Sequence, residues 1–210
     1  MRSDLTIVAC PGRPPRIESS GGLTARRTGP DTVHLVSAAA TPLGGDTIAV
    51  RVVVESGARL RLRSVAATLA LPGAATVESH ARWDIEAAGE LDVDPEPTVV
   101  AGGSRHVTVT SLRLHGAGSV RLRERVQIGR SGEREGFWSG CLSADADGAP
   151  LLRHRVELGT GAVADDALGT PLACVSELRY PQTSFDGPGT PLELAGGGVL
   201  ATWQGDRLIG

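Results

Sequence analysis

The chain has 210 residues, of which 28 are glycine, 13 are proline and only 3% are aromatic, so we expect one domain with a core of aliphatic side chains. Its formal net charge of −3 argues against the strongly basic surface that is typical of nucleic-acid-binding proteins. Three widely spaced cysteines without a CxxC motif argue against a disulfide framework or a zinc knuckle and favour a reducing compartment.

The N-terminal apolar run from Leu5 to Ala9 ends at Pro11 and is too short for the hydrophobic region of a secretory signal. Nowhere does an apolar run approach the roughly 18 residues that a transmembrane helix needs. We therefore expect a soluble, cytoplasmic protein that binds neither a membrane nor nucleic acid.

Period-two hydrophobic alternation, interrupted by turn-forming residues, predicts a series of strands along the chain. In chain order they are Leu5–Ala9, Val33–Ala39, Thr47–Glu55, Ala58–Ser64, Ala66–Leu71, Val77–Ile85, His106–Leu114, Val120–Ile128, Gly136–Ser143 and Leu152–Leu158. Short strands at this regular spacing indicate an all-β sandwich, barrel or solenoid. No fixed-length repeat is visible that would select the solenoid.

Residues 41–71 carry the clearest pattern. The apolar side chains of Thr47–Glu55 share one phase, and aliphatic residues alternate with arginines in Ala58–Ser64. Such alternation places one face of a strand in a core and the other in water. A turn at Glu55-Ser56-Gly57 joins the two strands. Before them, Gly44-Gly45 permits unusual backbone conformations, and Asp46 can hydrogen-bond its own turn.

Helix signals are weak and are confined to the last third of the chain. Asp165-Asp166-Ala167-Leu168 predicts a single turn, and Pro171–Tyr180 fits either a short helix or a further strand. Residues 181–198 are rich in glycine and proline and are expected to be irregular. We therefore predict an all-β fold with minor helix, in one domain over residues 1–210.

Glu124 is the first candidate functional residue, because it shares its strand phase with apolar residues. A carboxylate in an apolar stripe loses its hydration unless it is paired or metal-bound. One hypothesis is that Glu124 lines an internal polar passage for a cation. The alternatives are a structural ion pair, for example with Arg130, or a β-bulge that turns Glu124 outward. The apolar residues in phase with it are Val120, Leu122, Val126 and Ile128.

Two other acidic positions have both a simple and a functional interpretation. Asp46 is either a turn residue or a polar group at a partner surface or at the mouth of a passage. The acidic loop Asp94-Pro95-Glu96 is either solvated or able to hold a cation transiently.

Basic residues gather in two ladders on predicted strands. A solvated strand face is the simple interpretation, and docking onto an acidic protein surface is the functional one. With few aromatic residues between them, the ladders are a poor platform for single-stranded nucleic acid. The ladders are Arg59, Arg61 and Arg63, and Arg121, Arg123 and Arg125.

Candidate metal ligands of the nitrogen and sulfur type are scattered. Cys141 is interpreted as a small core residue rather than a thiolate ligand. The histidines form no i, i+2 or i, i+4 pair, so each is interpreted as a strand or turn residue. No tightly bound cofactor is therefore expected. The histidines are His34, His80, His106, His115 and His154.

Known catalytic and nucleotide-binding motifs do not fit the chain. Gly159–Ala164 matches G-x-G-x-x-A, but Gly169 and Pro171 would stop the helix that a dinucleotide site needs. Ser139 lies one residue away from a serine-hydrolase elbow position. Without lysine there is no P-loop, and without an H-x-H pair a cupin-like metalloenzyme is not supported. None of these motifs therefore supports catalysis.

Several motifs follow one another in an order that resembles the family of the urease accessory protein UreD, also called UreH. They are the block from Gly44 to Thr68, the loop Leu91–Pro97, the stretch Glu124–Glu133 and the turn Asp147–Leu151. The loop departs from the family, which has a Trp-Leu-Pro-Gln-like stretch there. The matches cover most of residues 20–160, and the chain resembles a short form of the family.

This resemblance implies an elongated, β-helix-like or sandwich-like fold of two packed sheets with a little helix. It also implies a non-enzymatic urease maturation factor that binds apo-urease and a UreF-type accessory protein and recruits a nickel-carrying UreG-type GTPase. Nickel would be in transit, with Glu124 and Asp46 as candidate passage residues and the arginine ladders as candidate docking residues. From the residues alone, a β-sandwich module that binds a protein or ligand without catalysis stays open.

Overall fold

The computed structural model describes residues 1–163, 165 and 169–208, and in this part of the chain there are seventeen β-strands and no helix. The expected minor helix is therefore not found among the described residues. Pro171–Tyr180 contains a strand, because its backbone pairs with a neighbouring strand on both edges, and most of the turn predicted at 165–168 lies outside the described residues. The described part also holds no helix that could span a membrane.

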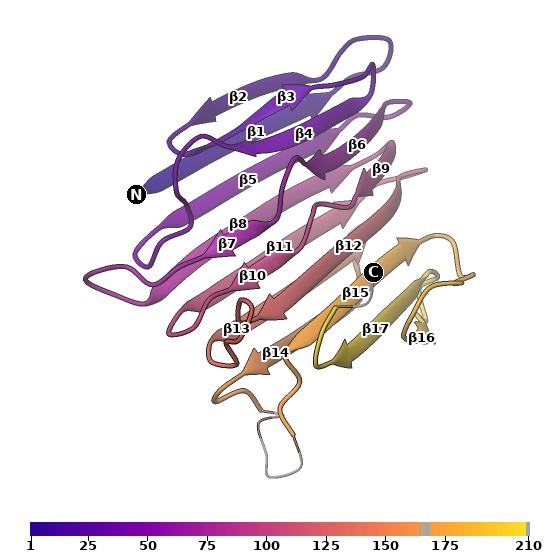
Figure 1. The fold of residues 1–210 in the computed structure, drawn as a ribbon. Helices are drawn as coiled ribbons and strands as arrows, with labels where there is room; N and C mark the ends of the chain where they lie inside the picture. Colours follow the sequence, from indigo (N-terminus) through magenta and orange to yellow (C-terminus); the bar gives the residue numbers. More distant parts are fainter. Residues whose placement is uncertain (164, 166–168, 209–210) are drawn as a thin grey trace.

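One sheet, called sheet A, has seven strands (Figure 1). Most of its neighbouring strands are parallel, whereas the two edge strands, β14 and β2, pair antiparallel. In order across the sheet the strands are β14 (Ala149–Gly159), β13 (Phe137–Ala146), β11 (Arg105–Leu114), β8 (Glu78–Ala87), β5 (Thr47–Val54), β1 (Arg2–Ala9) and β2 (Arg16–Ser20).

The other sheet, sheet B, has ten strands. Two short strands, β7 (Thr68–Ala70) and β10 (Thr98–Val100), pair with each other, and β10 also pairs with the end of β12. In order across the sheet the other strands are β16 (Thr190–Glu193), β17 (Val199–Gly205), β15 (Ala173–Tyr180), β12 (Ser119–Ile128), β9 (Glu90–Val93), β6 (Arg59–Ser64), β4 (Thr32–Ser37) and β3 (Leu23–Arg27).

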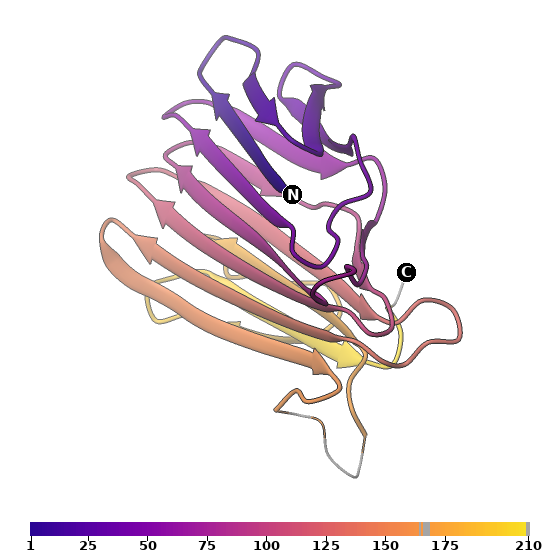
Figure 2. The same cartoon turned by 90° about the vertical axis from the view of Figure 1, so that its left-hand side faces the viewer.

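From β5 to β13 the chain passes from one sheet to the other and returns beside its previous strand. As a result β5, β8, β11 and β13 are parallel neighbours in sheet A, and β6, β9 and β12 are parallel neighbours in sheet B. The colours in Figures 1 and 2 run from one end of the molecule to the other for this reason. The elongated, β-helix-like, two-sheet architecture is confirmed.

The turn at Glu55-Ser56-Gly57 illustrates how one coil is made. The Ala58 amide donates to the Glu55 carbonyl at 3.0 Å, and Gly57 has a φ of 76°, which glycine adopts without a steric penalty. The turn therefore leads from β5 into β6, which belongs to the opposite sheet. Period-two alternation does not distinguish such a corner from a hairpin.

Strand register explains the core. Val52, Ile85, Leu112 and Ala144 are partners across β5, β8, β11 and β13, and each is at most 1% exposed. Because side chains alternate between the faces of a strand, one such row implies that every second row also points inward. The phase of the predicted strands is thus sufficient to predict which of their side chains belong to the core.

All ten predicted strands are present, and β15 adds a further strand to them. The strands without a prediction, β2, β3, β9, β10, β16 and β17, are short or lie near an edge. The irregular segment predicted at 181–198 is partly wrong, because it contains the edge strand β16. All four residues of β16 are exposed, and Pro191 lies among them, so the sequence shows no hydrophobic alternation that would predict this strand.

Buried apolar side chains form two groups. The large cluster occupies most of the space between the sheets and includes Leu60, Leu62, Ile85 and Leu112. The small cluster lies around the ends of β10 and β12. Its members are Ala70, Val100, Val126, Ile128, Trp138, Val156, Leu158, Leu172 and Cys174.

Candidate functional site

A layer of polar side chains separates the two apolar clusters. Glu124 and Ser176 are register partners on β12 and β15, and His154 occupies the equivalent position on β14. Along each of these three strands, the polar residue stands between two inward-facing apolar residues. One of the two belongs to the large cluster or packs on it, and the other belongs to the small cluster. With every second residue taken, the three sequences are Leu122-Glu124-Val126, Leu178-Ser176-Cys174 and Leu152-His154-Val156.

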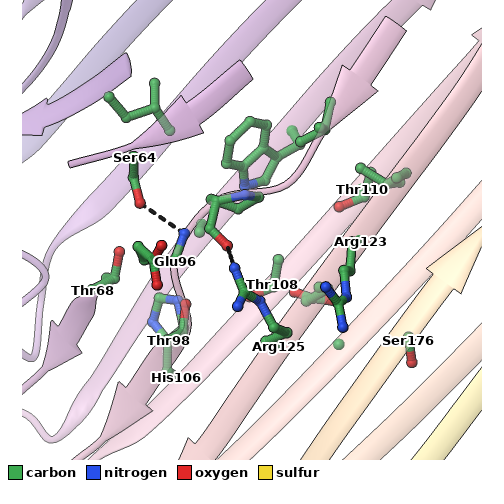
Figure 3. Close-up of a pocket in the computed structure, with 18 of the residues that line it drawn as sticks. Ser64, Thr68, Glu96, Thr98, His106, Thr108, Thr110, Arg123, Arg125 and Ser176 are labelled. Carbon is green, nitrogen blue, oxygen red and sulfur yellow. Dashed lines mark hydrogen bonds between the residues drawn. The ribbon is translucent and has the colours of Figure 1, made fainter. Parts of the chain in front are cut away.

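This layer borders a cavity of about 260 Å³ between the sheets (Figure 3). The cavity is lined by residues of both sheets, including Glu124 and His154, and its walls contain apolar side chains such as Trp83 and Trp138. Strand β11 turns three successive polar side chains inward instead of aliphatic ones. These are His106, Thr108 and Thr110, each at most 9% exposed.

An interruption of sheet B lets the cavity reach the surface. Strand β6 ends at Ser64 before β7 begins, and β9 ends at Val93 before β10 begins. The β9–β10 break lies beside the middle of β12, because β9 pairs up to Leu122 and β10 pairs only from Val126. The β6–β7 break lies next to it, because β6 pairs with β9 and β7 pairs with β10. The exposed residues at the break that also line the cavity are Val65, Ala66, Ala67 and Glu96.

Hydrogen bonds hold the two sides of this mouth together (Figure 3). The Glu96 amide donates to Ser64 Oγ at 2.9 Å, and Arg125 Nη2 donates to the Pro95 carbonyl at 2.7 Å. The loop is therefore only partly the solvated acidic segment that one interpretation expected. Asp94 is half-buried and paired with Arg125 at 3.2 Å, whereas Glu96 is exposed at the mouth.

Glu124 points inward, and neither of the two alternatives predicted from the sequence, a structural ion pair or a β-bulge that turns Glu124 outward, is found among the described residues. The pairing of β12 with β15 is regular through this position, so no bulge turns Glu124 outward. Arg130 instead pairs with Glu133, whose Oε1 accepts from Arg130 Nε at 2.9 Å. Within the described residues no hydrogen bond or ion pair reaches the Glu124 carboxylate. Burial raises its pKa to about 7, because the charged form is poorly hydrated there.

Two histidines line the same cavity, and the sequence assigned neither of them a role. His154 Nε2 is buried without a hydrogen-bond partner in the described structure. Burial lowers the pKa of His154, so its imidazole is neutral at pH 7. His154 shares the phase of Leu152 and Val156, which is the same sequence signal that identified Glu124.

His106 is the second of these histidines and is held in place. Its Nδ1 lies 2.9 Å from Ser79 Oγ, and the Ser79 hydroxyl is 3.5 Å from the Arg105 carbonyl. Burial, and to a lesser extent the charge of His80, lowers the pKa of His106 to about 4. His106 is therefore also neutral at pH 7.

Asp46 caps its turn and does not line the cavity. It is 5% exposed and accepts hydrogen bonds from the Leu43 amide at 2.8 Å, the Thr41 hydroxyl at 2.9 Å and the Met1 amine at 2.5 Å. Burial alone would raise the pKa of Asp46, but these donors outweigh it and lower the pKa. The structure thus does not bring Asp46 and Glu124 to one site, and a passage role for Asp46 stays a prediction.

The first arginine ladder is largely occupied by cross-strand ion pairs. Arg59 pairs with Glu90 at 2.6 Å, and Arg63 pairs with Asp92 at 2.5 Å. Arg61 is exposed and has no ion pair within the described residues. Of this ladder, Arg61 keeps a guanidinium that is free for an external partner.

The second ladder is only partly solvated, and its arginines form ion pairs. The side chains of Arg121, Arg123 and Arg125 are only 33%, 23% and 21% exposed. Acidic side chains from neighbouring segments pair with them: Arg121 pairs with Glu177 at 3.0 Å, and all three arginines approach Asp94. A docking role for this ladder stays a prediction.

Cys141 on β13 and Cys174 on β15 are poor candidate metal ligands. Cys141 is half-buried and does not line the cavity. Cys174 is buried, and burial raises the pKa of its thiol to about 11. Within the described part of the chain, no group of three or more His, Cys, Asp or Glu side chains is arranged to hold a metal ion.

Comparison with known proteins shows which family the chain resembles. The family described as UreD urease accessory protein matches residues 16–177. Urease accessory protein UreD 1 of Saccharopolyspora erythraea is 38% identical over 192 residues, which cover 86% of this chain and 74% of that protein. The UreD proteins of Frankia casuarinae and Frankia alni are both 41% identical, covering 76% and 91% of this chain. The chain spans 55% and 63% of the lengths of these two proteins.

Proposed function

Because this chain belongs to the UreD family of urease accessory proteins, we propose that it is a scaffold of the complex that delivers nickel to apo-urease. In this proposal its partners are a UreF-type accessory protein, a UreG-type GTPase and apo-urease. The GTPase hydrolyses the nucleotide, and this chain contributes binding surfaces and a path for the metal rather than catalysis.

The observation that supports a metal path is the unpaired Glu124 in the polar layer. A core would be more stable with an aliphatic residue there, since a carboxylate without a partner loses hydration and gains no ion pair. A passing cation supplies the missing partner. The cavity that Glu124 lines also reaches the surface beside Glu96, which places a second carboxylate at its mouth.

Weak binding is what transit requires. A site must attract a cation enough for entry and yet release it. Two carboxylates and two neutral imidazoles, spread along one cavity, provide single ligands in succession instead of a closed cage. Nickel is accordingly cargo in this proposal.

Two experiments test the proposal. In the first, the tagged chain is co-expressed with the UreF-type and UreG-type proteins and apo-urease, and the complex is isolated by affinity pull-down and size-exclusion chromatography. Co-elution in a defined complex supports the scaffold. A chain that runs alone, soluble and unbound, contradicts it and favours a generic binding module.

In the second experiment, Glu124→Gln is expected to preserve the fold and complex formation but to lower urease activation in cells, because a neutral amide attracts a cation less strongly. Glu18→Gln is the matched control, since Glu18 is exposed on β2, outside the cavity. If Glu124→Gln supports urease activation at the wild-type level, Glu124 has no role in the metal path.

A further inference from the structure

We propose that a groove between β2 and β3, called the end groove, is a docking site for an extended acidic segment of a partner protein. The two strands lie at one end of the molecule, where sheet A ends in β2 and sheet B ends in β3 (Figures 1 and 2). The end groove shares no lining residue with the cavity between the sheets, so docking there is independent of a metal path.

A tight turn and a hydrogen bond form one end of the groove. Gly21 has a φ of 81°, and a Cβ at this position would lie 2.3 Å from the Arg2 carbonyl oxygen, so only glycine lets the chain cross from β2 to β3 here. Beyond the turn, Ser19 Oγ and Thr24 Oγ1 lie 2.9 Å apart and join the two strands.

From this bond onward the two strands border a groove of about 400 Å³. Arg16 on β2 and Arg27 on β3 each stand three residues away from the bond, so both lie toward the far end of the groove, and Arg26 stands beside them. Two strands from different sheets therefore bring three arginines to one groove.

The guanidinium groups of these three arginines are not neutralised. Most arginines of the chain form an ion pair, in many cases across neighbouring strands. Arg16, Arg26 and Arg27 are exposed and have no ion pair within the described residues, and the acidic residue of β2, Glu18, does not line the groove. On a chain with a net charge of −3, the end groove is a local positive surface that attracts a negatively charged ligand.

The strand edges favour a polypeptide over a small anion. In the part of the chain that the structure describes, β2 pairs only with β1, and β3 pairs only with β4. Each strand thus keeps unpaired backbone N–H and C=O groups along its outer edge, and an added peptide strand can pair with such an edge.

The chemistry of the ligand follows from these two features. Arginine binds a carboxylate through two parallel hydrogen bonds, so aspartate and glutamate side chains suit the end groove. Strands β2 and β3 have five residues each, and an extended segment of about five residues therefore matches their length.

Fluorescence anisotropy of a fluorescein-labelled pentaglutamate peptide, titrated with the full-length chain at low salt, tests the site. A labelled pentaglutamine peptide controls for charge. The double variant Arg16→Ala/Arg27→Ala removes two of the three guanidinium groups. Arg82→Ala is the matched control, because Arg82 is exposed on β8, has no ion pair within the described residues and lies outside the groove.

We expect pentaglutamate to bind more tightly than pentaglutamine, and the double variant to weaken its binding by about fivefold or more. Arg82→Ala should behave like the wild type. Equal affinity of the double variant and the wild type, or an equal loss in Arg82→Ala, would overturn the site. If the double variant does not show a cooperative unfolding transition, Arg16→Gln/Arg27→Gln replaces it under the same criteria.

Two further titrations separate a polypeptide from a small anion. Pentaglutamate with N-methylated backbone amides cannot donate to a strand edge, so we expect it to bind more weakly. Unchanged affinity of this peptide, or its displacement by inorganic phosphate at an equal or lower concentration than by unlabelled pentaglutamate, would show an anion site and overturn docking of a segment. No metal and no other protein is present, so the result does not depend on the proposed role in urease maturation.

Discussion

Glu124 shows how a single buried carboxyl can make folding stability depend on pH. Its carboxyl has no partner in the described structure, and burial raises its pKa to about 7, well above the value of 4.5 for a hydrated glutamate. Ordinary core residues avoid this situation, since buried carboxylates are normally paired. The consequence is a stability that depends on pH in a direction opposite to that of a salt-bridged carboxylate.

The first prediction concerns that dependence. The folded chain keeps the Glu124 proton up to about pH 7, whereas the unfolded chain loses it near pH 4.5, so folding stability falls as the pH rises through this window. Glu124→Gln removes the effect. Relative to the wild type it should be more stable at pH 8, by up to about 3 kcal/mol, and similar at pH 4.

Urea unfolding of the wild type and of Glu124→Gln at the two pH values measures this difference. His106 titrates in the opposite sense, because its pKa is lowered, but it is present in both proteins and cancels in the comparison. An equal stability difference at pH 4 and pH 8 would mean that Glu124 is hydrated or paired in solution.

At the scale of the element, β13 shows how a strand shapes the cavity from within. Gly140 faces the cavity in the position where a larger side chain would be expected, and the Trp138 ring lies over it. The ring is held there because Trp138 Nε1 donates to Thr108 Oγ1 at 3.2 Å. A Cβ on Gly140 would lie 2.2 Å from the Trp138 ring.

The second prediction is that Gly140→Ala destabilises the protein by about 1–3 kcal/mol, since an overpacked core must displace the ring. The Trp138 emission spectrum should shift at the same time. Gly102→Ala is the control, because its nearest neighbour is the flexible Glu133 side chain at 3.4 Å. Thermal unfolding and fluorescence check the prediction, and an unshifted spectrum with wild-type stability would contradict it.

At the scale of the whole molecule, the cavity between the two sheets reaches the surface because sheet B is interrupted. Parallel coils stack β6, β9 and β12 in register, so the loops that interrupt β6–β7 and β9–β10 also stack. They place Ala66, Ala67 and Glu96 around one mouth. A regular sheet would have closed this face with hydrogen-bonded backbone.

The third prediction uses this mouth. Ala67→Trp should occlude it and lower urease activation in cells several-fold, while the complex with the accessory partners still assembles. Ala117→Trp places the same bulk on an exposed turn outside the cavity and should have no effect. Activation assays together with pull-downs separate the two effects. Full activation with Ala67→Trp would show that metal does not enter there.

Ten strands, and the phase of their side chains, could be predicted from the sequence. Alternation in residues 47–64 and 120–128 predicted which side chains face inward, and Glu124 followed from it. The ordered motifs predicted the family, which the comparison confirms over residues 16–177. These are local properties, because the side-chain period of a strand depends only on its own backbone.

The pairing of the strands, and the residues that their inward faces contact, could be found only from the folded chain. Arg121, Arg123 and Arg125 were predicted from their phase to face water, but Asp94 and Glu177 from neighbouring segments pair with them. That His154 and Glu124 line one cavity is visible only in the folded structure. A strand specifies its own two faces, whereas its neighbours are chosen by contacts between residues far apart in the chain, which no local pattern records.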